Sequence, residues 1–121
     1  MKAKVGISHS QKAWIVGNSN VEMTVTVLGA QMAPVVFDRN SKRPIQPYYI
    51  SPWQGEGLKM PCQLLAPLRG DFFCMPFGGN ATPYKGERHP PHGEVAGTNW
   101  KLVDCVKKGA VTTLAIACRT K

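Results

Sequence analysis

Two stretches of the chain gather most of the side chains that could do chemistry. Residues 68–79 read LRGDFFCMPFGG and carry Arg69, and residues 89–100 read HPPHGEVAGTNW and carry His89, His92, Glu94 and Trp100. Both stretches are rich in proline and glycine, which interrupt helices and are common in loops that hold polar side chains. We therefore expect a ligand to bind where these loops meet.

His92 and Arg69 are the side chains best suited to binding a polyhydroxylated ligand. The imidazole of His92 can donate to and accept from sugar hydroxyls, and Gly93 lets the backbone approach the ligand closely. The planar guanidinium of Arg69 suits a diol, a carboxylate or a phosphate. The alternatives are a His92 bonded to a loop carbonyl and an Arg69 in a structural ion pair with Asp71 or Glu94.

His89, His92 and Glu94 also allow a metal-binding interpretation, since two imidazoles and a carboxylate are a common ligand set. The pattern is similar to the histidines and glutamate of cupins, another β-sandwich class. However, a three-residue step across Pro90 and Pro91 does not place both histidines on one face of a strand. We therefore expect no metal and no other cofactor, and interpret Glu94 as a hydrogen-bond acceptor for the ligand or as a solvated loop acid.

Aromatic side chains in these stretches could stack on the apolar face of a sugar ring. Trp100 and Phe77 are two candidates. At Trp100, which opens a predicted strand, packing in the core is favoured over stacking. Phe72 and Phe73 point to opposite faces of an extended segment, so at most one of them lines a pocket.

The order of the pieces along the chain adds a family resemblance. An apolar run on each side of residues 28–30 (Leu-Gly-Ala) is followed by Arg69-Gly70, Pro76-Phe77-Gly78, His92-Gly93 and Trp100. This order resembles the sugar-contacting region of the galactose-mutarotase-like (aldose 1-epimerase) superfamily, nearest to its hexose-6-phosphate epimerase branch, over residues 11–119. The resemblance implies that His92 and Arg69 contact the sugar. It departs from that branch at residues 94–96 (Glu-Val-Ala), where the branch has an arginine, and this argues against a phosphorylated substrate.

The resemblance implies a carbohydrate-binding domain of an aldose 1-epimerase-like isomerase that acts on a sugar anomeric centre. Anomer interconversion needs one group to deprotonate the anomeric hydroxyl and another to protonate the ring oxygen, and no residue here matches the family's general base. Because the family's sandwich domain is more than twice as long, we expect residues 1–121 to form a single β domain, the amino-terminal portion of a longer antiparallel β-sandwich. The remainder of that domain or a homo-oligomer would complete it. The first alternative is a non-catalytic carbohydrate-binding β-sandwich module, and the second, which the sequence favours less, is a cupin-like metalloenzyme.

Composition favours a soluble, cytoplasmic protein with one domain. The chain has 121 residues, of which 43% are hydrophobic, and it shows neither a long apolar run nor a signal peptide. Its net charge is +8, but the cations are spread along the chain without interleaved aromatic residues, so we expect neither nucleic acid nor a membrane as partner. The cysteines form no Cys-x-x-Cys pair and are predicted to be free, buried thiols at positions 62, 74, 105 and 118.

The periodicity of the chain predicts an all-β, antiparallel fold. Residues 21–28 alternate apolar and polar side chains and are rich in β-branched residues, as is typical of a half-buried strand. Further strands are predicted at residues 13–16, 32–37, 101–106 and 111–118, the last two joined by a hairpin turn at residues 107–110. Five prolines in residues 44–67 exclude a long helix there, and no window shows a helical period, so we expect less than one helical residue in ten.

Overall fold

The computed structural model describes residues 3–121, and its regular structure consists of two antiparallel sheets. The larger sheet is a meander of β1 (Lys4–Ser8), β2 (Gln11–Gly17), β3 (Glu22–Thr26) and β4 (Met32–Val36), paired in that order. The smaller is the hairpin of β5 (Lys101–Lys108) and β6 (Val111–Ala117). The only helical segments of the described residues are two three-residue 3-10 turns, η1 (Gln63–Leu65) and η2 (Val95–Gly97).

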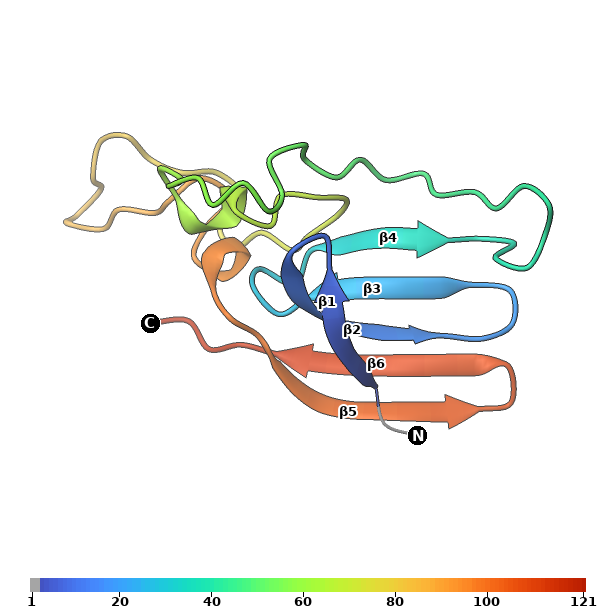
Figure 1. The fold of residues 1–121 in the computed structure, drawn as a ribbon. Coiled ribbons are helices and arrows are strands. Elements are labelled where there is room, and N and C mark those ends of the chain that lie inside the picture. Colours follow the sequence, from blue (N-terminus) through green and yellow to red (C-terminus); the bar gives the residue numbers. More distant parts are fainter. Residues whose placement is uncertain (1–2) are drawn as a thin grey trace.

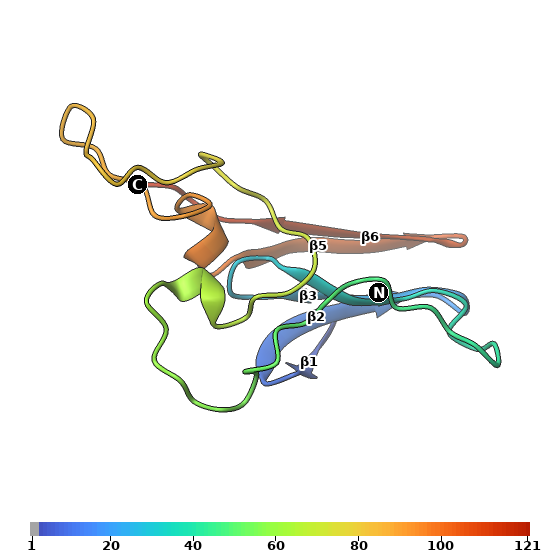
Figure 2. The same cartoon turned by 90° about the horizontal axis from the view of Figure 1, so that it is seen from above.

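The hairpin lies next to β2 and behind β1 in Figure 1, and the view from above shows it in a layer separate from β1 (Figure 2). The core shared by the two sheets contains Trp14 and Val16 from β2 and Cys105 from β5, and Leu114 and Ile116 from β6 pack against it. Burial of each large apolar side chain of this kind stabilises the fold by about 1.5–3 kcal/mol. Alternation along β6 places Leu114 and Ile116 on one face, and both pack against the core.

Residues 37–100 form a long connection between β4 and β5 that is irregular apart from the two 3-10 turns. Isolated bridges tie it down, including Met32 to Asp71, Ile50 to Arg69 and Met75 to Gly93. Its later part gathers at one end of the sheets, where the carboxyl-terminal residues also lie (Figures 1 and 2). Long loops that a rigid scaffold holds in place often carry binding residues. We therefore expect a site at this end of the sheets, which we call the loop end.

The predicted fold class is confirmed in its coarse form, since both sheets are antiparallel and helix is confined to the two short turns. The four predicted strands at residues 13–16, 21–28, 32–37 and 111–118 and the one at 101–106 all correspond to observed strands within a few residues. Strand β1 was not predicted, and β5 extends two residues further than expected. In the part of the chain described here, no helix has the length and apolar character needed to cross a membrane.

Candidate functional site

The two chemically rich stretches lie side by side because their backbones are bonded to each other. Met75 and Gly93 form a parallel bridge, and the amide of Glu94 donates to the carbonyl oxygen of Met75 at 3.2 Å. Gly93 has φ +78°, and a Cβ there would collide with the carbonyl groups of Met75 and Pro76. Only glycine tolerates both constraints, so this close approach requires a glycine directly after His92.

His92 is half-buried between two aromatic rings and a thiol. The rings of Phe72 and Phe77 meet its imidazole edge to face, with centroids 5.4 and 6.2 Å away. Its Nδ1 lies 3.5 Å from Sγ of Cys74. His92 is thus bonded to a side chain rather than to a loop carbonyl, which was the alternative raised by the sequence. Phe72 packs on the imidazole whereas Phe73 is exposed, as expected for neighbours in an extended segment.

His89 and Glu94 line one groove, of about 650 Å³, at the loop end. Met75 and Pro76 supply apolar surface to it, and the remaining lining residues are Glu87, Arg88, Pro90, Thr120 and Lys121. Nε2 of His89 lies 3.7 Å from a carboxylate oxygen of Glu87. Oε1 of Glu94 accepts the backbone N–H of Lys121 at 2.9 Å, which leaves Oε2 without a hydrogen bond to the described residues.

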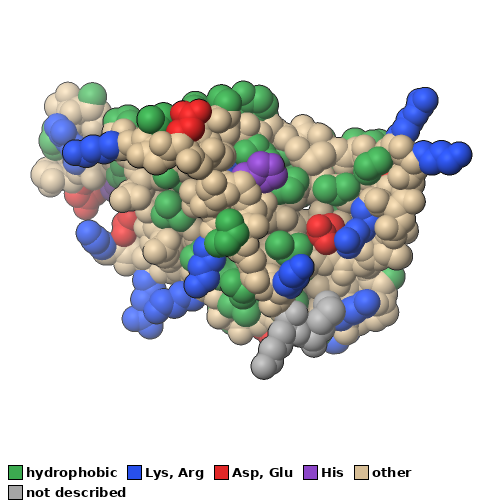
Figure 3. All heavy atoms as spheres, in the orientation of Figure 1, with side chains coloured by type: hydrophobic (Ala, Val, Ile, Leu, Met, Phe, Trp, Pro, Cys, Tyr) green, Lys and Arg blue, Asp and Glu red, His purple; other side chains and the backbone are tan. Residues whose placement is uncertain are grey.

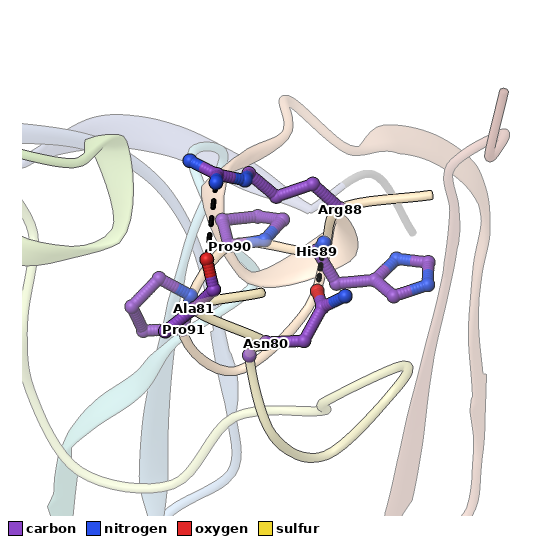
Figure 4. A pocket seen from close by; sticks show the side chains of 7 residues that line it. Asn80, Ala81, Arg88, His89, Pro90 and Pro91 are labelled. Carbon is purple, nitrogen blue, oxygen red and sulfur yellow. Dashed lines mark hydrogen bonds between the residues drawn. The ribbon is translucent and has the colours of Figure 1, made fainter. Parts of the chain in front are cut away.

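A second groove, of about 680 Å³, adjoins the first through Arg88, His89 and Pro90 (Figure 4). Here the backbone amide of His89 donates to Oδ1 of Asn80 at 2.6 Å, and the guanidinium of Arg88 donates to the carbonyl of Ala81 at 3.0 Å. Figure 4 shows the His89 imidazole pointing away from the Arg88 guanidinium. The two bonds hold residues 80–81 and 88–89 together, so residues 80–89 form a loop whose two ends are joined by hydrogen bonds.

Trp100 packs against the core, which agrees with the interpretation that the sequence favoured. Its Nε1 donates to the carbonyl oxygen of Val95 at 3.0 Å, so the indole also fixes the η2 turn that follows Glu94. The exposed side of the residue lines a groove of about 390 Å³ with Phe73, Met75 and Cys118. Trp100 therefore contributes one apolar surface next to the groove of His89 and Glu94.

Arg69 lies in the interior, where its side chain holds several backbone segments together. The residue is 2% exposed. Its Nε donates to Pro67 O at 2.7 Å, one terminal nitrogen donates to Ser8 O at 3.0 Å, and the other donates to His9 O at 3.0 Å and to Gln54 Oε1 at 2.8 Å. Four of its five N–H groups are thus engaged.

No carboxylate of residues 3–121 forms a salt bridge with Arg69, so the ion pair with Asp71 or Glu94 that the sequence left open is not formed. Burial without a counter-ion lowers the pKa of Arg69 to about 10. The residue borders a groove with Tyr48, Tyr49 and Trp53, separate from the groove of His89 and Glu94. In this arrangement Arg69 positions the β1–β2 turn and the 50–70 loop.

Sequence reasoning missed two residues of these networks. Gln31 is fully buried; its Oε1 accepts the amide of Arg69 at 2.8 Å and its Nε2 donates to Leu64 O at 3.0 Å. Cys74, predicted as a buried hydrophobe, is half-buried and bonded to His92. Neither has a local sequence signal, because each partner lies far away along the chain. Among the cysteines only Cys105 is buried as predicted.

The metal-ligand set considered for His89, His92 and Glu94 is not gathered. His89 faces Glu87, whereas His92 faces Cys74. Within residues 3–121 no three His, Cys, Asp or Glu side chains come together as a metal ion would require. The cations are also dispersed, since Lys and Arg side chains are scattered over the face in Figure 3 without forming one patch.

Comparison with protein-family models, with curated proteins and with solved structures finds no match for this chain. The resemblance carried by Arg69, His92 and Trp100 therefore stays a hypothesis.

Proposed function

We propose that the loop end of this protein is a carbohydrate-binding site and that the chain belongs to an aldose 1-epimerase-like isomerase. The two sheets would then be part of a larger antiparallel sandwich of the galactose-mutarotase-like kind. The observation that carries the proposal is that His89 and Glu94 line one groove beside apolar side chains.

This combination of groups suits the two kinds of surface that a sugar ring presents. The free Oε2 of Glu94 can accept from ring hydroxyls, and the imidazole of His89 can donate or accept. Met75 and Pro76 in the groove, with Trp100 and Phe73 next to it, offer apolar surface to the C–H face of the ring. A volume of about 650 Å³ is ordinary for a small-molecule site.

The family resemblance gives His92 a direct contact with the sugar and Arg69 another. For His92, Nε2 is the nitrogen available to a hydroxyl, since Nδ1 faces Cys74. For Arg69 the proposal is modified: its donors already hold the loops, so we assign it a positioning role. The general base for anomerisation is proposed to come from further chain or from a second copy.

Calorimetric titration with a panel of unphosphorylated aldoses tests the binding site. Glu94→Gln and His89→Gln each remove a polar partner, so we expect each to weaken binding by about 1–3 kcal/mol, or roughly 5- to 150-fold. Glu56→Gln is the matched control, because Glu56 is exposed and lines none of these grooves. Affinity that is unchanged in both groove variants, or no aldose binding at all, would refute the proposal.

A non-catalytic carbohydrate-binding module is the second candidate, and one observation favours it. Glu94, the groove carboxylate proposed to bind the sugar, already uses Oε1 to accept the backbone N–H of Lys121, as a structural acid would. Anomer exchange of a bound aldose, followed by nuclear magnetic resonance, separates the two candidates. Aldose binding without exchange in this chain and in any longer form of the protein would favour the module.

A further inference from the structure

Cys74, which has no part in the proposed sugar site, forms a side-chain pair with His92. Sγ of Cys74 lies 3.5 Å from Nδ1 of His92, within hydrogen-bond range for sulfur. The two residues are 18 positions apart and are brought together by the bridge between Met75 and Gly93. Because that bridge is reinforced by the amide of Glu94, the pair is held by backbone geometry rather than by flexible side chains alone.

We propose that Cys74 is a reactive thiol, activated by His92, that forms a covalent adduct with α,β-unsaturated carbonyl compounds. A thiolate is the nucleophilic form of cysteine, and an adjacent imidazole is a common means of generating it. Both side chains are half-buried, so they are partly shielded from water and still open to a small molecule. The proposed reaction uses Nδ1 of His92, whereas the proposed sugar contact uses Nε2, and the reaction is tested without a sugar.

The reaction balances without an added oxidant or reductant. His92 Nδ1 takes the thiol proton from Cys74, and the sulfur lone pair then attacks the β-carbon of the unsaturated carbonyl compound. The C–S bond forms while the carbon–carbon π bond breaks, and its electron pair moves to the carbonyl oxygen as an enolate. The imidazolium of His92 returns the proton to the α-carbon, which gives a neutral thioether and the free imidazole.

The surroundings of the pair favour an electrophile with an apolar or aromatic substituent. Phe72 and Phe77 flank the imidazole, and Phe77 is 80% exposed. Phe73 and Met75 are also exposed large apolar side chains in the same segment. An exposed aromatic ring beside the imidazole offers an apolar face to such a substituent. An aromatic group on the electrophile could stack on Phe77 while Cys74 reacts.

The other cysteines provide controls within the same molecule. Cys62 and Cys118 are half-buried like Cys74, but no histidine of residues 3–121 bonds to either sulfur. Burial, and to a lesser degree the charge of Glu94, raises the pKa of the Cys118 thiol, which disfavours its thiolate. Cys105 is buried in the core. Differences in rate among the four thiols therefore report on local chemistry.

The experiment treats the whole protein with N-phenylmaleimide or N-ethylmaleimide near pH 6, quenches at intervals, and measures modification of each cysteine by peptide mass spectrometry. We expect Cys74 to react about tenfold faster than Cys62 and Cys118, because only at Cys74 can an imidazole take the thiol proton as the sulfur attacks. We also expect the ratio of the N-phenylmaleimide rate to the N-ethylmaleimide rate to be larger at Cys74 than at Cys62. Rates at Cys74 within about twofold of those at Cys62 and Cys118 would overturn the proposal.

His92→Asn is the variant that isolates the imidazole. His92 has φ +62°, and asparagine is among the few residues that adopt this left-handed conformation readily, so the turn should be retained. We expect the variant to lose about tenfold in rate at Cys74 and nothing at Cys62. An unchanged rate at Cys74 would overturn the role of His92. If the variant fails to fold, the comparison among the cysteines of the unaltered protein decides the question by itself.

Discussion

Replacing Arg69 by methionine removes the guanidinium and keeps an unbranched apolar stem in the interior. The change deletes the donors to Pro67 O, Ser8 O, His9 O and Gln54 Oε1. It leaves the backbone amide of Arg69 bonded to Gln31. The perturbation is thus confined to the link between the β1–β2 turn and the 50–70 loop.

The expected cost follows from which acceptors can find water. His9 is exposed, so its carbonyl oxygen can be rehydrated, whereas Ser8 and Gln54 are half-buried and can be rehydrated only in part. Pro67 is buried and Ser8 is half-buried, and an acceptor left without a partner there costs about 1–3 kcal/mol. Part of this loss is offset, because burial of Arg69 without a counter-ion is itself unfavourable, as its lowered pKa indicates. We therefore expect Arg69→Met to lower the free energy of unfolding by about 3 kcal/mol.

Urea unfolding followed by circular dichroism measures this loss, which should appear as a midpoint shift of roughly 2 M. Arg39→Met is the matched control: Arg39 pairs with Glu22 at 2.8 Å, but both side chains are about one-third exposed. A pair of this kind contributes about 0–1 kcal/mol. Equal losses in the two variants, or a loss below about 0.5 kcal/mol in Arg69→Met, would show that Arg69 does not hold these loops.

Two further predictions concern single positions. The Asp71 carboxylate raises the pKa of Tyr48 above its ordinary value of 10.0 by hydrogen bonding and by its charge. Asp71→Asn should therefore shift the titration of Tyr48 to lower pH. The titration is measured by phenolate absorbance, and the part of it that Tyr48→Phe loses is assigned to Tyr48. Because the pKa of Tyr48 is raised in the folded state, the protonated phenol stabilises the fold below about pH 10, and this stabilisation is lost as the pH rises through the folded-state pKa. An unchanged titration in Asp71→Asn would contradict the assignment. Gly93 and Gly86 both have a positive φ, +78° and +80°, but only at Gly93 would a new Cβ collide with backbone atoms. In urea unfolding, Gly86→Ala should lower the free energy of unfolding by about 1 kcal/mol, and Gly93→Ala should lower it by at least about 2 kcal/mol more. Equal costs would mean that the approach of residues 75 and 93 is not rigid.

The sequence alone was enough to predict the antiparallel strands, because each of them carries a local pattern. Alternation of apolar and polar side chains in a segment rich in β-branched residues located β3, the hairpin turn at residues 107–110 located β5 and β6, and the prolines of residues 44–67 excluded helix from the long connection. The pattern also separated Leu114 and Ile116, which pack on the core, from the outward face of β6. These features depend on neighbours two residues apart along the chain.

Strand β1 was missed because its local pattern is weak: the strand is short and contains Gly6. It is joined to β2 by a turn in which His9 and Ser10 both have positive φ, 44° and 65°, and neither is a residue type that marks such a hairpin turn. The turn is held instead by Arg69, more than 50 residues away, which binds the carbonyl groups of Ser8 and His9. Tertiary contacts thus override local preference at this point.

The same distinction explains the site. The sequence indicated which residues carry chemistry, namely Arg69, His89, His92, Glu94 and Trp100. Only the tertiary structure separated their roles, because burial and partners depend on distant segments: Arg69 is enclosed by loops from residues 8–9 and 54, while His89 and Glu94 share a groove. The pairing of Cys74 with His92 likewise required the bridge at residues 75 and 93, since a cysteine by itself carries no sign of the imidazole that the fold places beside it.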